Sequence, residues 1–235
     1  MLARHRGHVQ QVLFRHGGRR KGAGRPPKGA RAGQAHDARP VIKARHALHV
    51  VLRVVPEVGS LRRREMYRAI RAASVTAAAR GRIRIVHVSI QRTHIHLLVE
   101  ANDKVALGIG MQGFQISAAR HINTALGDGR RRRGRVFCDR YHLVVVTSPT
   151  QARHVLSYVL NNWRKHAEDG SGTLVDPFST GILFAGWKEL EHTGMWRIPA
   201  GYEPLVVRPP RSWLLTKGWR LCGTISAREV PSRPE

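Results

Sequence analysis

The hydrophobic and polar positions between residues 47 and 167 predict seven consecutive elements. Segments rich in β-branched residues with a period of two indicate strands, and segments with apolar residues every three or four positions indicate helices. In chain order, the sequence predicts a strand at 47–55, a helix at 61–80 capped by Ser60, strands at 83–90 and 94–100, a helix at 104–126, a strand at 136–146, and a helix that follows Ser148 and runs to about Ala167.

This order predicts an α+β fold with three parts along the chain. Strand, helix, strand, strand, helix, strand is a ferredoxin-like split βαβ arrangement with a four-stranded antiparallel sheet, and the last helix is an extra C-terminal one. Residues 45–168 would form this domain. Residues 1–44 have no hydrophobic period, so we expect a disordered basic arm. Residues 169–235 read as a loop-rich extension that either packs on the core or forms a small appendage.

The last helix begins with a specific start signal. Ser148 stands at the N-cap, Pro149 at the first helical position and Gln151 three residues after the cap. Each satisfies a requirement of the first turn, where backbone N–H groups have no partner within the helix. Along this helix His154, Tyr158 and Asn162 are four residues apart, so they stack on one side of it, next to the apolar stripe.

Two histidines mark the centre of the predicted domain. In the segment His94-Ile95-His96 the residues two apart project to the same face of a strand, so both imidazoles point one way. Histidine is the commonest protein ligand of metals, and a strand fixes the separation of the two rings. The pair therefore predicts half of a metal site, although two polar positions on a half-exposed strand would give the same pattern.

The charge of the chain predicts a polyanionic partner. Its 235 residues contain 41 Lys plus Arg and 15 Asp plus Glu, a formal net charge of +26. Such a surface binds phosphates by releasing counterions, which makes nucleic acid the first candidate and an anionic membrane the second. No apolar run approaches the roughly 20 residues that span a bilayer, so we expect a cytoplasmic protein. The two cysteines, Cys138 and Cys222, suggest neither a disulfide framework nor a thiolate zinc site.

Two basic stretches are candidates for contacts with nucleic acid. The segment 22–29, with Arg25 and Lys28, resembles the core of an AT-hook, in which an extended Arg-Pro segment lies in a narrow minor groove. A solvated linker is the alternative. The run 130–135 includes Arg131, Arg132, Arg133 and Arg135, which would contact phosphates from a loop. A solvated charged turn is the alternative there.

Taken together, these motifs resemble those of a known enzyme family. Over residues 45–168 the chain resembles the Y1-type HUH single-strand endonucleases of the IS200/IS605 transposase group, and most closely the REP-associated tyrosine transposases. The resemblance rests on residues 93–98 (Thr-His-Ile-His-Leu-Leu) and 157–162 (Ser-Tyr-Val-Leu-Asn-Asn). Trp163 stands where relatives often have proline, a departure that concerns the end of this helix and leaves the nucleophile unaffected.

The resemblance implies a mechanism and a set of site residues. It implies that His94, His96 and Asn162 bind a divalent metal, Mg²⁺ or Mn²⁺, and that Tyr158 attacks DNA to leave a covalent 5′-phosphotyrosine and a free 3′-hydroxyl. The expected substrate is single-stranded or hairpin DNA, in line with a basic groove and stacking aromatics. The protein would act as a monomer or a homodimer, and Tyr158 would serve its own histidines or those of a second subunit.

Two other functions compete with this interpretation. His94, His96 and Glu100 also match part of a cupin metal motif, but a cupin would be all-β, and the residues after Glu100 predict a helix. A DNA-repeat-binding protein that kept the fold without catalysis is the second alternative. The presence of all four implied site residues disfavours it.

Overall fold

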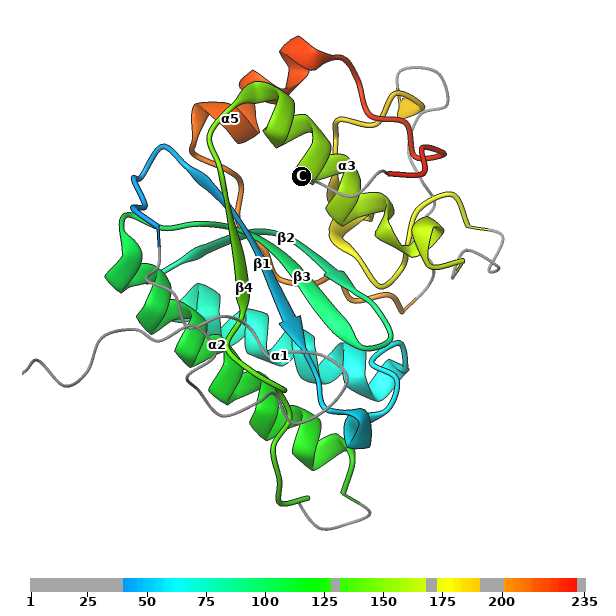
Figure 1. Cartoon of the computed structure of the whole chain (residues 1–235). Helices are drawn as coiled ribbons and strands as arrows, with labels where there is room; N and C mark the ends of the chain where they lie inside the picture. The colour runs from blue at the N-terminus through cyan, green and yellow to red at the C-terminus, as the bar shows by residue number, and fades with distance from the viewer. Residues whose placement is uncertain (1–39, 128–131, 168–172, 191–200, 232–235) are drawn as a thin grey trace, which may run out of the picture. The chain divides into compact units, whose positions relative to one another are not determined.

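The centre of the fold is a four-stranded antiparallel sheet with the strand order β2-β3-β1-β4 (Figure 1). The computed structural model describes residues 40–127, 132–167, 173–190 and 201–231. The strands are β1 (Ala47–Arg53), β2 (Arg84–Ile90), β3 (His94–Glu100) and β4 (His142–Val146). With α1 between β1 and β2, and α2 between β3 and β4, this is the predicted split βαβ arrangement. The predicted α+β fold is therefore confirmed.

Helices cover both faces of this sheet. Helices α1 (Arg64–Arg80) and α2 (Lys104–Ala125) lie on one face, and α3 (Pro149–Lys165) lies on the other (Figure 1). Alternate residues of each strand supply two separate cores. In β3, the odd-numbered residues from Ile95 to Val99 join the core under α1 and α2, whereas Leu98 joins the core under α3. His94 and His96 lie four and two residues before Leu98 on the same strand, so they also face α3.

The first turn of α3 forms as the sequence predicts. The hydroxyl of Ser148 accepts a hydrogen bond from the backbone N–H of Gln151 at 3.2 Å. In return, the side-chain oxygen of Gln151 accepts one from the backbone N–H of Thr147 at 2.9 Å. Pro149 occupies the start of the helix. This reciprocal cap fixes where α3 begins and hence which of its residues face the sheet.

Two predicted boundaries are wrong. The first helix begins at Arg64 instead of following a Ser60 cap, because the Ser60 hydroxyl accepts its hydrogen bond from the N–H of Arg62 in a local turn. The residue at the N-cap, Arg63, provides no side-chain cap. The last strand is shorter than predicted. Only an isolated bridge between Phe137 and Val54 continues the pairing towards residue 136, since polar residues 139 and 140 form a local turn.

Helix α2 tolerates interior glycines for a packing reason. A Cβ atom at Gly110 would collide with the side chain of Ile83, just before β2. The absence of a side chain at this position lets the helix approach the sheet edge closely, which offsets the low helix propensity of glycine.

The described parts of the C-terminal extension pack on the domain. Short helices α5 (Trp213–Thr216) and η3 (Gly218–Cys222) follow a 3₁₀ turn, η2 (Thr180–Leu183). Leu214, Leu215 and Trp219 are buried in the core under α3. Of the two options that the sequence left open, packing on the core is therefore the observed one for these segments. No helix within the described residues is long and apolar enough to cross a membrane.

Candidate active site

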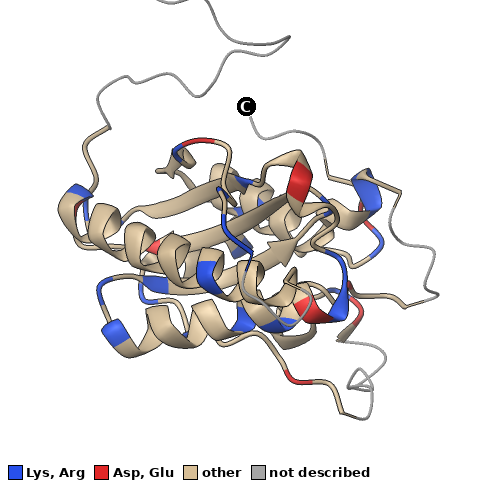
Figure 2. Cartoon of the chain, turned by 90° about the horizontal axis from the view of Figure 1, so that it is seen from below, with Lys and Arg blue, Asp and Glu red and all other residues tan. Residues whose placement is uncertain are grey.

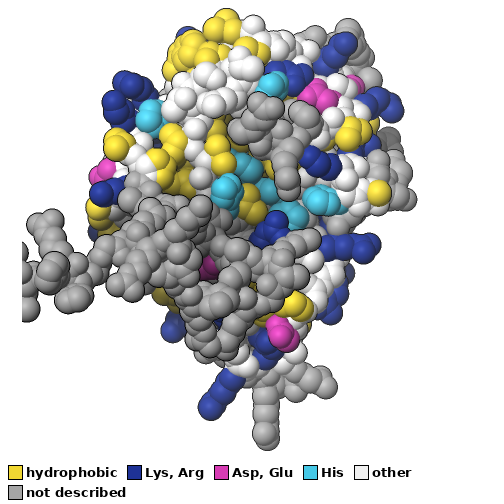
Figure 3. All heavy atoms as spheres, viewed as in Figure 1, with side chains coloured by type: hydrophobic (Ala, Val, Ile, Leu, Met, Phe, Trp, Pro, Cys, Tyr) yellow, Lys and Arg dark blue, Asp and Glu magenta, His cyan; other side chains and the backbone are white. Residues whose placement is uncertain are grey.

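The two histidines of β3 lie on the sheet face that α3 covers. The rings of His94 and His96 have centroids 4.7 Å apart and are nearly perpendicular, at 82°. His96 is almost fully buried, with 2% of its surface exposed, and His94 is half-buried. Figure 3 shows histidine side chains gathered near the middle of the side of the molecule that faces the viewer. The strand period places both rings together, as the sequence predicts.

Helix α3 brings Tyr158 and Asn162 to the same place. The side-chain nitrogen of Asn162 lies 2.7 Å from Nε2 of His96. The ring of Tyr158, one turn earlier, lies perpendicular to that of His96, with centroids 5.4 Å apart. All four residues implied by the family resemblance therefore converge, and they do so within a single chain.

A third histidine, His49 of β1, also belongs to this cluster. Its Nε2 lies 3.0 Å from Nδ1 of His96, and its ring lies 5.8 Å from that of Tyr158. Sequence reasoning missed it, because His49 reads as one polar position in an apolar strand. The available signal was its position on β1, where it shares the α3 face with His96 once β1 pairs antiparallel with β3.

The contacts of His96 assign different roles to its two ring nitrogens. Its Nε2 accepts a hydrogen bond from the side-chain N–H of Asn162, so this nitrogen carries the lone pair, and a metal would bind it in place of that hydrogen bond. Its Nδ1 then carries the hydrogen and donates it to Nε2 of His49. Metal-binding histidines commonly donate their second N–H in this way, which fixes the tautomer and the ring orientation. His49 is thus placed to orient His96.

Burial keeps these imidazoles neutral. It lowers the pKa of His49 to about 4, with the neighbouring His142 adding to the effect. Burial also lowers the pKa of His94 to about 4, assisted by the nearby His166. The pKa of His96 is lowered well below its usual value for the same reason. Neutral rings retain the lone pairs that a metal requires at physiological pH.

An unsatisfied amide oxygen completes a possible donor set. Oδ1 of Asn162 is buried and has no hydrogen-bond partner. A buried polar atom of this kind costs free energy unless something binds it, so it points to a ligand at this position. Among the described residues, no three His, Cys, Asp or Glu side chains form a metal-binding group, so a metal here needs the amide. The amide oxygen is a donor of the kind that Mn²⁺ and Mg²⁺ favour, and the two imidazoles would complete the set.

Other polar groups surround the tyrosine. The Lys165 ammonium lies 5.2 Å from the centre of the Tyr158 ring, and the His166 ring lies 5.5 Å from that of His94. His154, one turn before the tyrosine, is exposed, as expected of a surface histidine. The end of α3 thus supplies a cation beside the tyrosine.

The comparisons with known proteins decide the family. The family model described as "Transposase IS200 like" matches residues 43–162, which is half of the chain. The chain belongs to the IS200-like transposase family. The matched range ends at Asn162 and includes both histidines of β3, so it spans the candidate site of this transposase.

A solved structure agrees on the fold. A REP-associated tyrosine transposase bound to a REP hairpin is similar with a TM-score of 0.52 at 15% identity, over 74% of this chain and 99% of that one. A putative transposase from Deinococcus radiodurans R1 matches with a TM-score of 0.36 at 14% identity, over 54% of this chain and 95% of that one. No curated protein matches. The α+β fold and the family exclude the all-β cupin alternative. Glu100 of that motif instead accepts hydrogen bonds from the backbone N–H groups of Arg211 and Ser212.

In this transposase a C-terminal segment, residues 224–229, holds α3 against the sheet. The guanidinium of Arg153 binds both the carboxylate of Glu229 and the carbonyl of Thr224. Further along the helix, Asn161 donates to the carbonyl of Ser226 and Arg164 donates to that of Ala227. These contacts follow one side of α3 for most of its length, so this segment fixes the helix that carries Tyr158.

The basic loop before β4 lies at the same end of the sheet as His94. The backbone N–H of Cys138 bonds to the carbonyl of Arg53, which pairs with His94 in the sheet. The guanidinium of Arg132 donates a hydrogen bond to the side-chain oxygen of Asn123 at 2.9 Å. The guanidinium of Arg135 donates one to the carbonyl of Phe137 at 2.6 Å. Arg133 is exposed. The assignment of this loop to DNA stays a prediction, and Arg25, Lys28 and Arg131 lie outside the described residues.

Proposed function

We propose that this transposase cuts and rejoins single-stranded or hairpin DNA through a covalent 5′-phosphotyrosine at Tyr158, with Mg²⁺ or Mn²⁺ held by His94, His96 and Asn162. The observation that carries the proposal is that the Tyr158 ring and Asn162, whose Oδ1 is unpaired, both contact the ring of His96. An unactivated phenol, with a pKa of about 10, is a weak nucleophile. A metal beside Tyr158 would compensate by making the phosphate easier to attack.

When bound, the metal would neutralise charge on a non-bridging phosphate oxygen. The protein supplies the nucleophile, Tyr158. Oη of Tyr158 forms a bond to phosphorus, and the bond from phosphorus to the 3′ oxygen breaks. The phenolic proton passes to solvent, and the departing 3′ oxygen takes up a proton to become a hydroxyl. Attack by another 3′-hydroxyl on the phosphotyrosine reverses these steps and joins strands without ATP.

Charge and fold support DNA as the substrate. The excess of Lys and Arg over Asp and Glu gives the +26 net charge. Figure 2 shows Lys and Arg distributed over the helices and loops, with few acidic residues among them. The solved structural neighbour is bound to a REP hairpin, and we extend this class of ligand to the present chain. Phosphate contacts supply most sequence-independent affinity for DNA.

A denaturing gel tests the proposal. The protein is mixed with Mn²⁺ and labelled DNA hairpins that carry single-stranded flanks, drawn from inverted repeats that flank the gene. We expect a covalent protein–DNA band that Tyr158→Phe abolishes and Tyr141→Phe retains. Tyr141→Phe is the matched control because Tyr141 is another half-buried tyrosine. A protein that binds these hairpins tightly without ever forming the band would instead be the non-catalytic repeat-binding alternative.

A further inference from the structure

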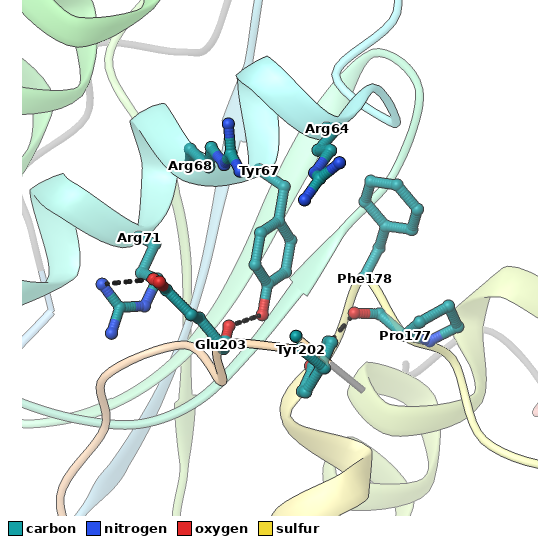
Figure 4. A pocket seen from close by; sticks show the side chains of 9 residues that line it. Arg64, Tyr67, Arg68, Arg71, Pro177, Phe178, Tyr202 and Glu203 are labelled. Carbon is teal, nitrogen blue, oxygen red and sulfur yellow. Dashed lines mark hydrogen bonds and ion pairs between the residues drawn. The ribbon is translucent and has the colours of Figure 1, made fainter. Parts of the chain in front are cut away.

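A pocket that is separate from the His94 cluster lies between α1 and two segments of the C-terminal extension. Figure 4 shows side chains that line it, and its volume is about 170 Å³. Helix α1 contributes Tyr67 and three arginines, and the extension contributes residues 177–178 and 201–203. The proposed chemistry at Tyr158 uses none of these residues.

Aromatic rings form the wall of this pocket. Tyr67 contacts the ring of Phe178 edge-on, with centroids 5.8 Å apart, and the ring of Tyr202 at 6.0 Å. Hydrogen bonds fix both phenols, since Tyr67 donates to the carbonyl of Glu203 at 2.8 Å and Tyr202 to that of Pro177 at 3.1 Å. Burial raises the pKa of each phenol, so both stay neutral. The aromatic wall is thus held in place by hydrogen bonds and is uncharged.

Two arginines at the rim are available to a ligand. Arg64 and Arg68 are exposed, and neither forms an ion pair with any residue that the structure describes. They are four residues apart on α1, so they lie one turn apart on the same side. Arg71, the third arginine, is already engaged by the Glu203 carboxylate at 3.2 Å and by the carbonyl of Pro204. Figure 4 shows Arg64 and Arg68 on the helix above the aromatic rings.

We propose that this pocket binds one unpaired nucleobase of the DNA substrate, stacked on the aromatic wall, while Arg64 and Arg68 contact the phosphates on either side of it. A base supplies the planar ring that an aromatic wall accepts, and its neighbouring phosphates supply two negative charges at a spacing that suits cations one helical turn apart. The inference rests on the proposed function, because it takes DNA as the ligand.

The position of the pocket suits a strand that also reaches the active site. The residues just before α1 are bonded to the turn that precedes His94: Leu61 donates to the carbonyl of Arg92, and Arg62 donates to that of Ile90. Phe178 accepts a hydrogen bond from the N–H of Ile90 through its carbonyl. The pocket and the histidine cluster therefore lie at the same end of β2 and β3, the pocket on the α1 side of the sheet and the cluster on the α3 side, so a DNA strand would pass around this end to reach both.

Photocrosslinking tests whether a base enters the pocket. The full-length protein is irradiated with a mixed-sequence single-stranded DNA pool in which 5-iododeoxyuridine replaces thymidine, and crosslinked peptides are identified by mass spectrometry. We expect a crosslink at Tyr202 or Phe178 that excess single-stranded DNA removes and excess blunt duplex does not. Crosslinks that fall only elsewhere, or equal competition by the duplex, would overturn the proposal.

Two variants separate stacking from charge. Tyr202→Leu keeps the apolar volume but removes the ring, and we expect it to weaken single-stranded DNA binding about 5- to 150-fold with an unchanged salt dependence. Arg64→Ala combined with Arg68→Ala should lower the slope of log affinity against log salt by about 1.4. The controls are Trp213→Ala, an exposed tryptophan, and Arg120→Ala, an exposed arginine of α2. Equal effects of test and control variants would contradict the base pocket.

The outcomes also separate this inference from the proposed function. If the Tyr202→Leu variant binds single-stranded DNA normally and still forms the Tyr158 adduct, the base pocket is wrong and the proposed function stands. If the wild-type protein forms no adduct yet the crosslink maps to Tyr202, the proposed chemistry is wrong and the pocket remains a DNA-binding site.

Discussion

The ring of Tyr158 stands perpendicular to that of His96, with their centroids 5.4 Å apart, although the two residues come from a helix and a strand that are far apart in the sequence. This relationship exists within one chain. It makes a complete candidate site available to a single copy of the protein, which the sequence patterns left undecided.

Replacing Asn162 tests the amide oxygen as a ligand. Asn162→Leu removes the unpaired Oδ1, and we expect it to weaken Mn²⁺ binding by more than about tenfold, measured by titration calorimetry. Asn162→Asp, which restores an oxygen donor at the same position, should recover binding. Wild-type affinity in the leucine variant would exclude Asn162 from the metal site.

Replacing His49 tests its role in orienting His96. His49→Ala removes the acceptor at 3.0 Å from Nδ1 of His96, and we expect about a 10- to 100-fold loss of Mn²⁺ affinity. His49→Gln offers an amide oxygen in its place and should restore part of this loss. A purely structural role would lower the stability of both variants without distinguishing their metal affinities.

The C-terminal segment 224–229 should stabilise α3. Glu229→Gln removes the charge that Arg153 binds and leaves a partly buried guanidinium without its carboxylate. We expect the free energy of unfolding, measured by urea denaturation, to fall by about 1–3 kcal/mol. Glu57→Gln, at an exposed position, is the control. Equal stability of the Glu229 variant and the wild type would show that this segment contributes little to holding the helix.

Acid should destabilise the fold partly through His87. Burial lowers the pKa of His87 to about 4 in the folded protein, against about 6.5 in the unfolded chain. The unfolded state therefore binds the extra proton first, and the contribution of His87 to stability is complete above pH 6.5 and falls as the pH drops towards 4. This one group accounts for about 3 kcal/mol.

The measurement for His87 is the free energy of unfolding as a function of pH. His87→Leu should flatten the decrease between pH 6.5 and 4, whereas His154→Leu, at an exposed position, should not. The other buried histidines keep part of the slope in both variants. An identical slope in the His87 variant would mean that the pKa of His87 is the same in the folded and the unfolded protein.

The sequence predicts what depends on local periods. The common orientation of His94 and His96 follows from the period of a strand. The position of Tyr158 and Asn162 on one side of a helix, one turn apart, follows from the period of a helix. The cap at Ser148 is equally local. The meeting of these two pairs is not local, since it depends on α3 covering one particular face of the sheet, and only the family resemblance implied it.

The features that the sequence patterns do not predict depend on long-range pairing or on competition for a hydrogen bond. His49 joins the site only because β1 lies beside β3 in one specific register. The pocket at Tyr67 needs a segment near residue 202 that no pattern connects to α1. The Ser60 cap failed because a nearby N–H competed for the hydroxyl before the helix began.

The most direct test of the central claim is peptide mapping of the covalent product. After reaction with hairpin DNA and Mn²⁺, the protein is digested with nuclease and protease, and the peptides are analysed by mass spectrometry. The account predicts a nucleotide attached through a 5′-phosphate to Tyr158 and to no other tyrosine. DNA that is cut while Tyr158 remains unmodified, or a nucleotide found on a different residue, would contradict it.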